Sequence, residues 1–432
     1  MSSRRGAGGA PSATLPLTYL VSAATAFVVA LTALPWLAPE LAGHYYHPRV
    51  LALTHTVTLG WITMSILGAS YQLIPVVLEL PLWSERLARW QLGVLLVGVT
   101  GMVAHFWIGS WAGLACAAAL MGLAVSMHLI NVAASLRRFD RWTFTACLVA
   151  LGQVGLAITV LFGTALAMNH VWPFLPGELF PTLHAHVHLA LAWWIAPMLI
   201  GVSARVFPMF LLSPEPQGWP GPVQLYGLLL GAPVLVVGLV AAPALVAPGA
   251  LALAAAAAGH VVWVIAMARG RRRAGLDWGL RFILTASGFL PLGTALGLAL
   301  ALDLMSGPRI ALAYAVLLLG GWVSLSIVGM MLKIVPFLVW YRVYSPLVGR
   351  RPVPVLAELG WPAAEGMAWA LLTAGFLSLA GAAAVGNASW IAASGAILAL
   401  GSLSFAATLG RVLSHLTAPA PGLAPSAGAI TR

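Results

Sequence analysis

The sequence predicts an all-α integral membrane protein with twelve transmembrane helices, and three observations lead to that prediction. First, 61% of the 432 residues are hydrophobic and only 7% are charged, a composition that excludes a soluble globular domain. Second, apolar runs of about 20 residues, the length that crosses a bilayer, recur along the whole chain. Third, one motif occurs three times at a spacing typical of domain-sized repeats.

Twelve apolar segments are expected to span the membrane. The first of them follows a polar tail and leads into further spans, so we interpret it as a helix of the protein and not as a signal peptide. The expected spans cover residues 16–38, 50–78, 88–110, 112–136, 142–168, 180–212, 221–242, 244–268, 279–303, 307–340, 363–386 and 389–412.

The repeated motif is a tryptophan, a glycine and a proline at steps of seven residues. Steps of seven drift only about 20° around a helix, so each trio marks one stripe of a long helix. The glycines are expected to allow close approach of a neighbouring helix. The three copies are Trp61, Gly68 and Pro75; Trp194, Gly201 and Pro208; and Trp322, Gly329 and Pro336.

The motif helices are the second, sixth and tenth spans, which divides the chain into three units of four spans. All three motif helices run in the same direction, so we expect parallel repeats around a pseudo-threefold axis along the membrane normal. The units cover residues 14–141, 142–268 and 269–415. The tails at 1–13 and 416–432 are rich in Ala, Gly, Pro and Ser and are expected to be disordered.

The basic residues predict the topology. Seventeen arginines fall in the tails and links on one side, against only Arg49 and Arg309 on the other, which places both termini in the cytoplasm. The net charge of +11 is thereby explained, and anionic lipid head groups, not nucleic acid, are the expected polyanions. We expect a multi-pass protein of the inner (cytoplasmic) membrane. The seventeen are Arg4, Arg5, Arg86, Arg89, Arg137, Arg138, Arg141, Arg269, Arg271, Arg272, Arg273, Arg281, Arg342, Arg350, Arg351, Arg411 and Arg432.

Reporter fusions test this topology. Fusions placed after residues 47, 175 and 305 are expected to report the external side, because these links carry few basic residues. A cytoplasmic signal from any one of them would contradict both the topology and the repeat scheme.

Histidines within apolar spans mark the candidate site. His184, His186 and His188 begin the sixth span, and His55 and His188 each lie six residues before a motif tryptophan, where the third copy has Val316. Carboxylates are scarce and lie almost entirely in links, which argues against an acid–base hydrolase or a carboxylate-rich metal site. Neutral imidazoles in apolar surroundings suit a porphyrin iron.

Neighbouring pockets can share the histidines of the sixth span. Residues 186 and 188 point to opposite sides, because two residues turn a helix by about 200°. The pocket between the second and sixth spans would receive His55 from one wall and His186 or His188 from the other. His184 shares a face with His188 and could support either ligand by a hydrogen bond.

The other histidines have several possible roles. Packing or hydrogen bonding is as plausible as ligation for His105, His128 and His260. His44, His47 and His170 lie at the outer surface, where metal uptake, contact with heme propionates and solvation are all open; with His105 they are additional candidate metal ligands. Cys116 and Cys147 lie in apolar spans, so no cysteine-based zinc or iron–sulfur site is expected.

Two stretches resemble the heme-ligand helices of heme-copper oxidase catalytic subunits, in particular the C-family oxidases and nitric oxide reductases. They are His186–Val187–His188 followed by Trp194 and Gly201, and His55–Thr56 followed by Gly60–Trp61 and Tyr71. In that family, an H-x-H pair on helix 10 serves two hemes, and a histidine on helix 2 completes the low-spin heme. Here the pair lies on the sixth span, the tenth has Tyr314 and Val316, and the seventh has no His–His pair of copper ligands.

The resemblance implies a divergent membrane hemoprotein of respiratory electron transport. It implies heme, preferably b-type, with copper or non-heme iron as a further metal, NO or O₂ as the gaseous ligand, and a quinol or a cytochrome as electron donor. NO reduction or gas binding without proton pumping is the preferred oxidoreductase activity. The alternatives are a membrane protein that handles copper or heme through its outer histidines, and a transporter or structural subunit. A second copy or a partner subunit could complete the site.

Overall fold

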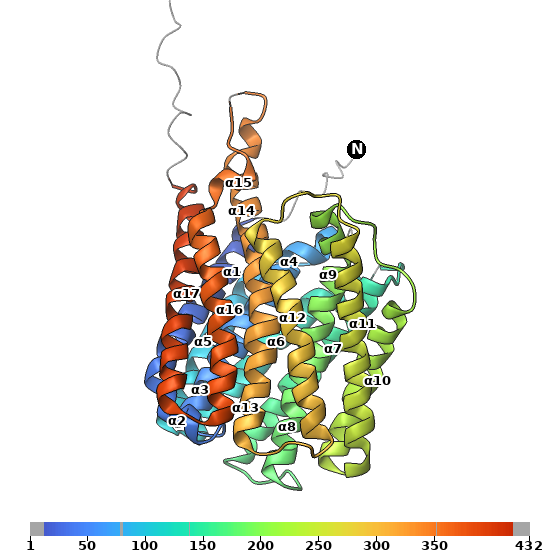
Figure 1. Ribbon diagram of the computed structural model, residues 1–432, viewed down its shortest axis with the longest axis vertical. Helices are drawn as coiled ribbons and strands as arrows, with labels where there is room; N and C mark the ends of the chain where they lie inside the picture. The colour runs from blue at the N-terminus through green and yellow to red at the C-terminus, as the bar shows by residue number, and fades with distance from the viewer. Residues whose placement is uncertain (1–12, 78–80, 138, 351, 418–432) are drawn as a thin grey trace, which may run out of the picture.

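The structure is a computed structural model that describes residues 13–77, 81–137, 139–350 and 352–417. Within these ranges it is helical and contains no strand. Twelve of the described helices are long and apolar enough to cross a membrane, which confirms the predicted number of spans. The protein is therefore a multi-pass membrane protein whose long helices lie side by side in one bundle (Figure 1).

Nine of the spans surround the three motif helices. The first bends through a 3-10 turn, and the eighth begins with one. Their bounds are α1 (Thr14–Ala33) with η1 (Leu34–Leu37) and α2 (Ala38–Gly43), α5 (Glu85–Ile108), α6 (Trp111–Leu136), α7 (Phe144–Asn169), α10 (Pro220–Val240), η4 (Pro243–Leu245) with α11 (Val246–Arg269), α12 (Trp278–Ala301), α16 (Pro362–Val385) and α17 (Ala388–Ser414). The short η6 (Ser345–Leu347) and α15 (Leu356–Leu359) lie in the link before α16.

Polar caps and glycines end the helices at the short links. Ser84, Thr143 and Asp277 each accept a hydrogen bond from a backbone N–H in the first turn of α5, α7 and α12. Gly109 and Gly386 end α5 and α16 in the left-handed conformation, with φ of 69° and 73°. The links that follow are short, so successive helices run antiparallel.

The three motif helices share an interruption that the sequence did not predict. Each consists of an α-helix, a π-helical segment that contains the motif tryptophan, and a second α-helix. A π-helix bonds each residue to the fifth along the chain, and such segments are frequent at functional sites. The motif helices are α3 (Pro48–His55), η2 (Thr56–Thr63) and α4 (Met64–Val77); α8 (Leu179–Leu189), η3 (Ala190–Ile195) and α9 (Ala196–Leu211); and α13 (Pro308–Ala315), η5 (Val316–Ser324) and α14 (Leu325–Val343).

The motif tryptophans connect these helices in the interior. The Trp61 indole N–H donates to Ser324 Oγ at 3.0 Å, and the Trp194 indole N–H donates to Thr63 Oγ1 at 3.3 Å. Each acceptor lies two residues after a motif tryptophan. The π-segment η2 is therefore bonded to both η3 and η5, and both donor rings are almost fully buried.

The motif glycines allow the close contacts expected of them. A Cβ atom on Gly68 would lie 2.4 Å from Tyr19 Cβ, and one on Gly201 would lie 2.9 Å from Leu148 Cβ. A Cβ atom on Gly329 would lie 2.6 Å from the carbonyl oxygen of Gly279. Each motif helix thus packs directly on the first helix of its expected unit: α1, α7 or α12.

A Gly329→Ala substitution is expected to destabilise the protein by about 1–3 kcal/mol, because the new methyl group meets backbone that cannot move away alone. Gly288→Ala is the matched control, since a Cβ atom there has nothing within 4 Å. Thermal melting of the two purified variants measures the difference. Equal melting temperatures would contradict the close approach of α14 and α12.

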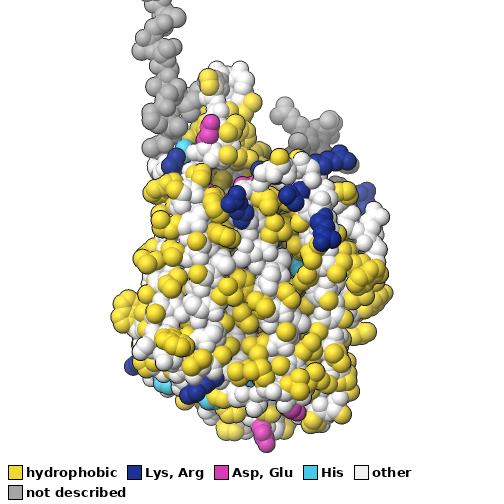
Figure 2. Space-filling view, in the orientation of Figure 1, with side chains coloured by type: hydrophobic (Ala, Val, Ile, Leu, Met, Phe, Trp, Pro, Cys, Tyr) yellow, Lys and Arg dark blue, Asp and Glu magenta, His cyan; other side chains and the backbone are white. Residues whose placement is uncertain are grey.

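Basic side chains concentrate at one end of the bundle. On the face seen in Figure 2, Lys and Arg gather near the end where α1 begins and α17 ends. Three basic residues of the motif helices have acidic partners: Arg49 forms an ion pair with Glu40, Arg205 with Glu215, and Lys333 with Asp277. Even these charges within the apolar sequence are therefore neutralised by a carboxylate.

The structure bears only in part on the predicted tails, the cysteines and the repeat units. The tails at 1–13 and 416–432 lie outside the described residues, apart from Ala13, Leu416 and Thr417. Both cysteines are free; Cys116 is exposed and Cys147 is half-buried. The division into three units of four spans and the cytoplasmic orientation of the ends stay predictions.

Candidate functional site

His55 is held in a defined orientation at the end of α3, directly before the π-segment η2. Its Nδ1 lies 2.8 Å from the Leu51 carbonyl oxygen. Because a carbonyl can only accept, Nδ1 carries the proton, and the lone pair is on Nε2. Phe106 of α5 stacks on the ring at 4.7 Å between centroids. This backbone bond orients a metal-ligating histidine in the way that supporting hydrogen bonds commonly do.

His186 lies on α8, and its ring packs against α7. Phe162 stacks on the ring at 6.4 Å between centroids, and a Cβ atom on Gly163 would lie 2.8 Å from it. The carbonyl of Thr159 on α7 is near the His186 ring, and Nδ1 of His186 is buried without a hydrogen-bond partner. The partner of His55 on the sixth span stays a prediction.

His188 faces the opposite neighbour. Its Nδ1 lies 2.8 Å from the His184 carbonyl oxygen, which repeats the arrangement of His55. Its Nε2 lies 3.3 Å from the Tyr314 hydroxyl, which donates to it, and the two rings stack at 6.0 Å between centroids. His188 thus belongs to a second pair, between α8 and α13.

Tyr314 is the site residue whose role sequence reasoning missed. It lies eight residues before Trp322, as His186 lies eight residues before Trp194. The two side chains pack in the same way: a Cβ atom on Gly163 would lie 2.8 Å from His186, and one on Gly297 would lie 2.7 Å from Tyr314. The equivalent positions of Tyr314 and His186 in the repeat are the sequence feature that could have identified Tyr314 as a site residue.

The side chains of His55, His186, His188 and Tyr314 are half-buried. By contrast, Trp61 and Trp194, further along the same helices, are almost fully buried. Glycines back the rings of His186 and Tyr314, and Nδ1 of His186 has no hydrogen-bond partner. Neutral imidazoles of this kind fit the ligands of a metal at the centre of a planar aromatic macrocycle.

Tyrosine side chains of the link between α2 and α3 contact two histidines. Tyr45 lies 2.9 Å from Nε2 of His184, and Tyr46 lies 3.2 Å from Nε2 of His170. Burial raises the pKa of both tyrosines and lowers the pKa of His170, so each hydroxyl stays protonated and donates to a neutral imidazole. Trp111 stacks on His170 at 4.2 Å between centroids.

His44 and His47 lie in the link between α2 and α3. Nδ1 of His44 accepts from the backbone N–H of Tyr46 at 3.0 Å, and Nδ1 of His47 accepts from that of Arg49 at 3.3 Å and caps α3. Both rings line a surface hollow together with Glu40. They lie apart from the His55–His186 pair and have local structural partners.

The remaining histidines lie in other environments. His105 rests on Gly113, where a Cβ atom would lie 2.1 Å from its ring. His128 is fully buried, with one ring nitrogen 3.0 Å from the Tyr71 hydroxyl and the other 2.9 Å from Gln153 Oε1. His260 lines a separate cavity, described below. Hydrogen bonding accounts for His128, whereas Nδ1 of His105 is buried without a hydrogen-bond partner.

No group of three or more His, Cys, Asp or Glu side chains that could hold a metal ion occurs among the described residues. A porphyrin iron needs only one or two protein ligands, so this finding bears on bare metal ions alone. No family model and no curated protein matches the chain.

Proposed function

We propose that the protein is a divergent heme-copper-oxidase-like membrane hemoprotein that carries out electron transfer and NO or O₂ chemistry. One observation carries the proposal: two motif helices each present a histidine, His55 on α3 and His186 on α8, shortly before a π-segment, and the Leu51 carbonyl sets the His55 tautomer. His55 and His186 would hold a b-type heme in a low-spin site. Bound heme supplies one-electron redox chemistry and, where a coordination position is open, gas binding.

The His188–Tyr314 pair supports a second, different site. His188 offers a single oriented imidazole, and Tyr314 offers a hydroxyl in place of a second one. A site with one imidazole keeps a coordination position for a small gas such as NO. The hydroxyl can donate a hydrogen bond to a polar ligand in this pocket.

The third pair of motif helices, the tenth span with the second, offers no metal-ligating side chain at the corresponding positions. The positions that correspond to His55 and His186 are Val316 on η5 and Leu53 on α3. Neither side chain can bind a metal, so we propose at most two hemes for each chain. No Asp or Glu is fully buried in the described part of the chain, which supports chemistry without a carboxylate-lined proton route.

An absorption spectrum of the purified protein tests the proposal. We expect a b-type spectrum after expression with an adequate heme supply, with a low-spin component from the His55–His186 site. A colourless protein that is correctly inserted and folded would contradict the proposal. Metal analysis of the same sample shows whether copper or non-heme iron accompanies the heme.

Copper or heme handling on the outer side is the second candidate function. It is supported by the surface hollow lined by His44, His47 and Glu40. Copper bound by the full-length protein and lost from a variant with both histidines changed to alanine would favour it. Retention of the heme spectrum in that variant would show that the two functions are separate.

A further inference from the structure

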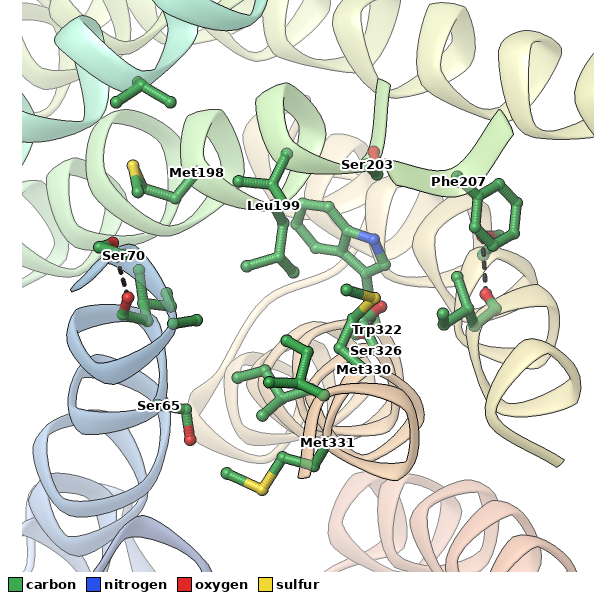
Figure 3. A pocket seen from close by; sticks show the side chains of 18 of the residues that line it. Ser65, Ser70, Met198, Leu199, Ser203, Phe207, Trp322, Ser326, Met330 and Met331 are labelled. Atoms are coloured by element: carbon green, nitrogen blue, oxygen red, sulfur yellow. Dashed lines mark hydrogen bonds between the residues drawn. The ribbon is translucent and has the colours of Figure 1, made fainter. Parts of the chain in front are cut away.

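A separate cavity lies between α4, α9 and α14, the second halves of the three motif helices (Figure 3). Its volume is about 110 Å³, and its lining is almost entirely apolar. None of the described residues that line it is Lys, Arg, Asp or Glu. A cavity of this size has room for about three water molecules, because each takes up roughly 30 Å³ in the liquid.

Trp322 brings an unused hydrogen-bond donor to this cavity. The indoles of Trp61 and Trp194 each donate to a hydroxyl that lies two residues after a motif tryptophan. The corresponding residue for Trp322 is Ala196, which has no acceptor in its side chain. Among the described residues the Trp322 indole N–H has no partner, and its ring lies among the lining side chains (Figure 3). The side chain is nevertheless only 4% exposed.

His260 of α11 is the second hydrogen-bonding group at the same wall. Its ring meets the Trp322 ring edge-on, at 6.4 Å between centroids and 63° between planes. It is only 6% exposed, and no described residue hydrogen-bonds to its ring. A neutral imidazole has one donor and one acceptor nitrogen, so this wall can both donate and accept hydrogen bonds.

These polar groups decide which filling suits the cavity. Cavities lined only by apolar groups stay dry, whereas a buried water is held where two to four polar groups bond to it. Trp322 and His260 supply two such groups, and they would be costly to leave unpaired in an apolar interior. The lining serines add acceptor lone pairs, because their hydroxyl hydrogens are donated to carbonyl oxygens of their own helices. These serines are Ser70, Ser203, Ser287 and Ser326.

We propose that a small cluster of water molecules binds in this cavity, at the wall formed by Trp322 and His260. One water accepts from the Trp322 N–H and pairs with the His260 ring, and its neighbours donate to serine oxygens. The cluster places exchangeable protons beside a titratable imidazole, in a cavity that no described Asp or Glu lines. This water site does not depend on heme.

Water-edited solid-state NMR of the full-length protein in lipid, with isotope-labelled tryptophan, tests the inference. Magnetisation passes quickly from water to an indole N–H only where the two are in close contact. We expect the Trp322 signal to rise several-fold faster than those of Trp61 and Trp194, whose indoles donate to protein hydroxyls. The loss of one signal in a Trp322→Phe variant assigns the Trp322 indole.

Trp263 is the matched control within the same protein. Its indole N–H is also buried without a hydrogen-bond partner, one turn of α11 after His260, but Trp263 does not line the cavity. We therefore expect its signal to rise as slowly as that of Trp61. A signal from Trp263 as fast as that of Trp322 would show that the cavity has no special role, and would overturn the inference.

Two variants remove the partners of the water. Ala196→Ser supplies the hydroxyl that the other two interfaces have, and is expected to slow the transfer to Trp322 several-fold, because it engages the indole N–H within the protein. His260→Phe removes the second polar group and is expected to act in the same direction. Thermal melting verifies the folding of both variants.

The unaltered protein is sufficient to contradict the inference. A Trp322 signal that rises as slowly as that of Trp61 would overturn it. So would uptake of xenon into the cavity in the same sample, since xenon fills dry apolar cavities.

The outcome also separates this inference from the heme proposal. A low-spin heme spectrum in a protein whose Trp322 signal rises slowly would overturn the water site alone. Fast transfer to Trp322 in a protein without heme would support the water site and contradict the heme proposal.

Discussion

Replacement of His55 by alanine is expected to abolish the low-spin heme spectrum while the protein still inserts into the membrane. The Leu51 carbonyl leaves the lone pair of His55 on Nε2, which is free to bind a metal, and we propose His186 as the second ligand. His186→Ala is expected to give the same loss. Absorption and electron paramagnetic resonance spectra of the purified variants measure it.

His188→Ala is the matched control for this prediction. His188 has the same position relative to a motif tryptophan and the same Nδ1 hydrogen bond, but it faces Tyr314. We therefore expect the low-spin signal to be kept. Added imidazole is also expected to restore the signal in a His55→Gly variant, since it can fill the space of the lost ring. An unchanged spectrum in the His55→Ala protein would remove this assignment.

Binding of CO and NO to the reduced protein is expected to depend on His188. In a His188→Ala variant the gas-induced difference spectrum should disappear, because the imidazole that contacts Tyr314 is lost. Tyr314→Phe removes the hydroxyl that lies 3.3 Å from His188 and keeps the ring, so we expect gas affinity to change by about 5- to 10-fold, the size of one hydrogen bond. Difference spectroscopy on reduced samples measures both effects.

Turnover with an artificial donor in sealed vesicles extends this prediction to activity. We expect NO consumption or reversible gas binding, with weak O₂ reduction and no proton pumping. The seventh span has no His–His pair, and no Asp or Glu is fully buried among the described residues. Rapid O₂ turnover with acidification of the vesicle interior would contradict this expectation. A spectrum insensitive to both gases would limit the protein to electron transfer or a structural role.

The sequence by itself determined the membrane fold and the candidate histidines. Apolar runs and their links were sufficient to predict the twelve spans, because a segment in lipid must satisfy its backbone within one helix. The repeated tryptophan, glycine and proline located the three motif helices, and the glycine positions predicted close helix contacts. His55 and the histidines of the sixth span stood out because imidazoles are rare in such apolar sequence.

Only the tertiary structure decided which side chains face one another. His186 and His188 point to opposite sides of one helix, so their partners depend on the order in which the three motif helices surround the centre. A sequence repeat does not reveal whether that order is clockwise or anticlockwise. Each π-segment also rotates the α-helix before it relative to the motif tryptophan by an amount that differs from that of an ideal α-helix. The faces of the histidines therefore cannot be worked out from α-helical spacing alone. For these reasons, the contact of His188 with Tyr314 and the lack of a partner for the Trp322 indole became visible only once the helices were packed, and the partner of His55 stays a prediction.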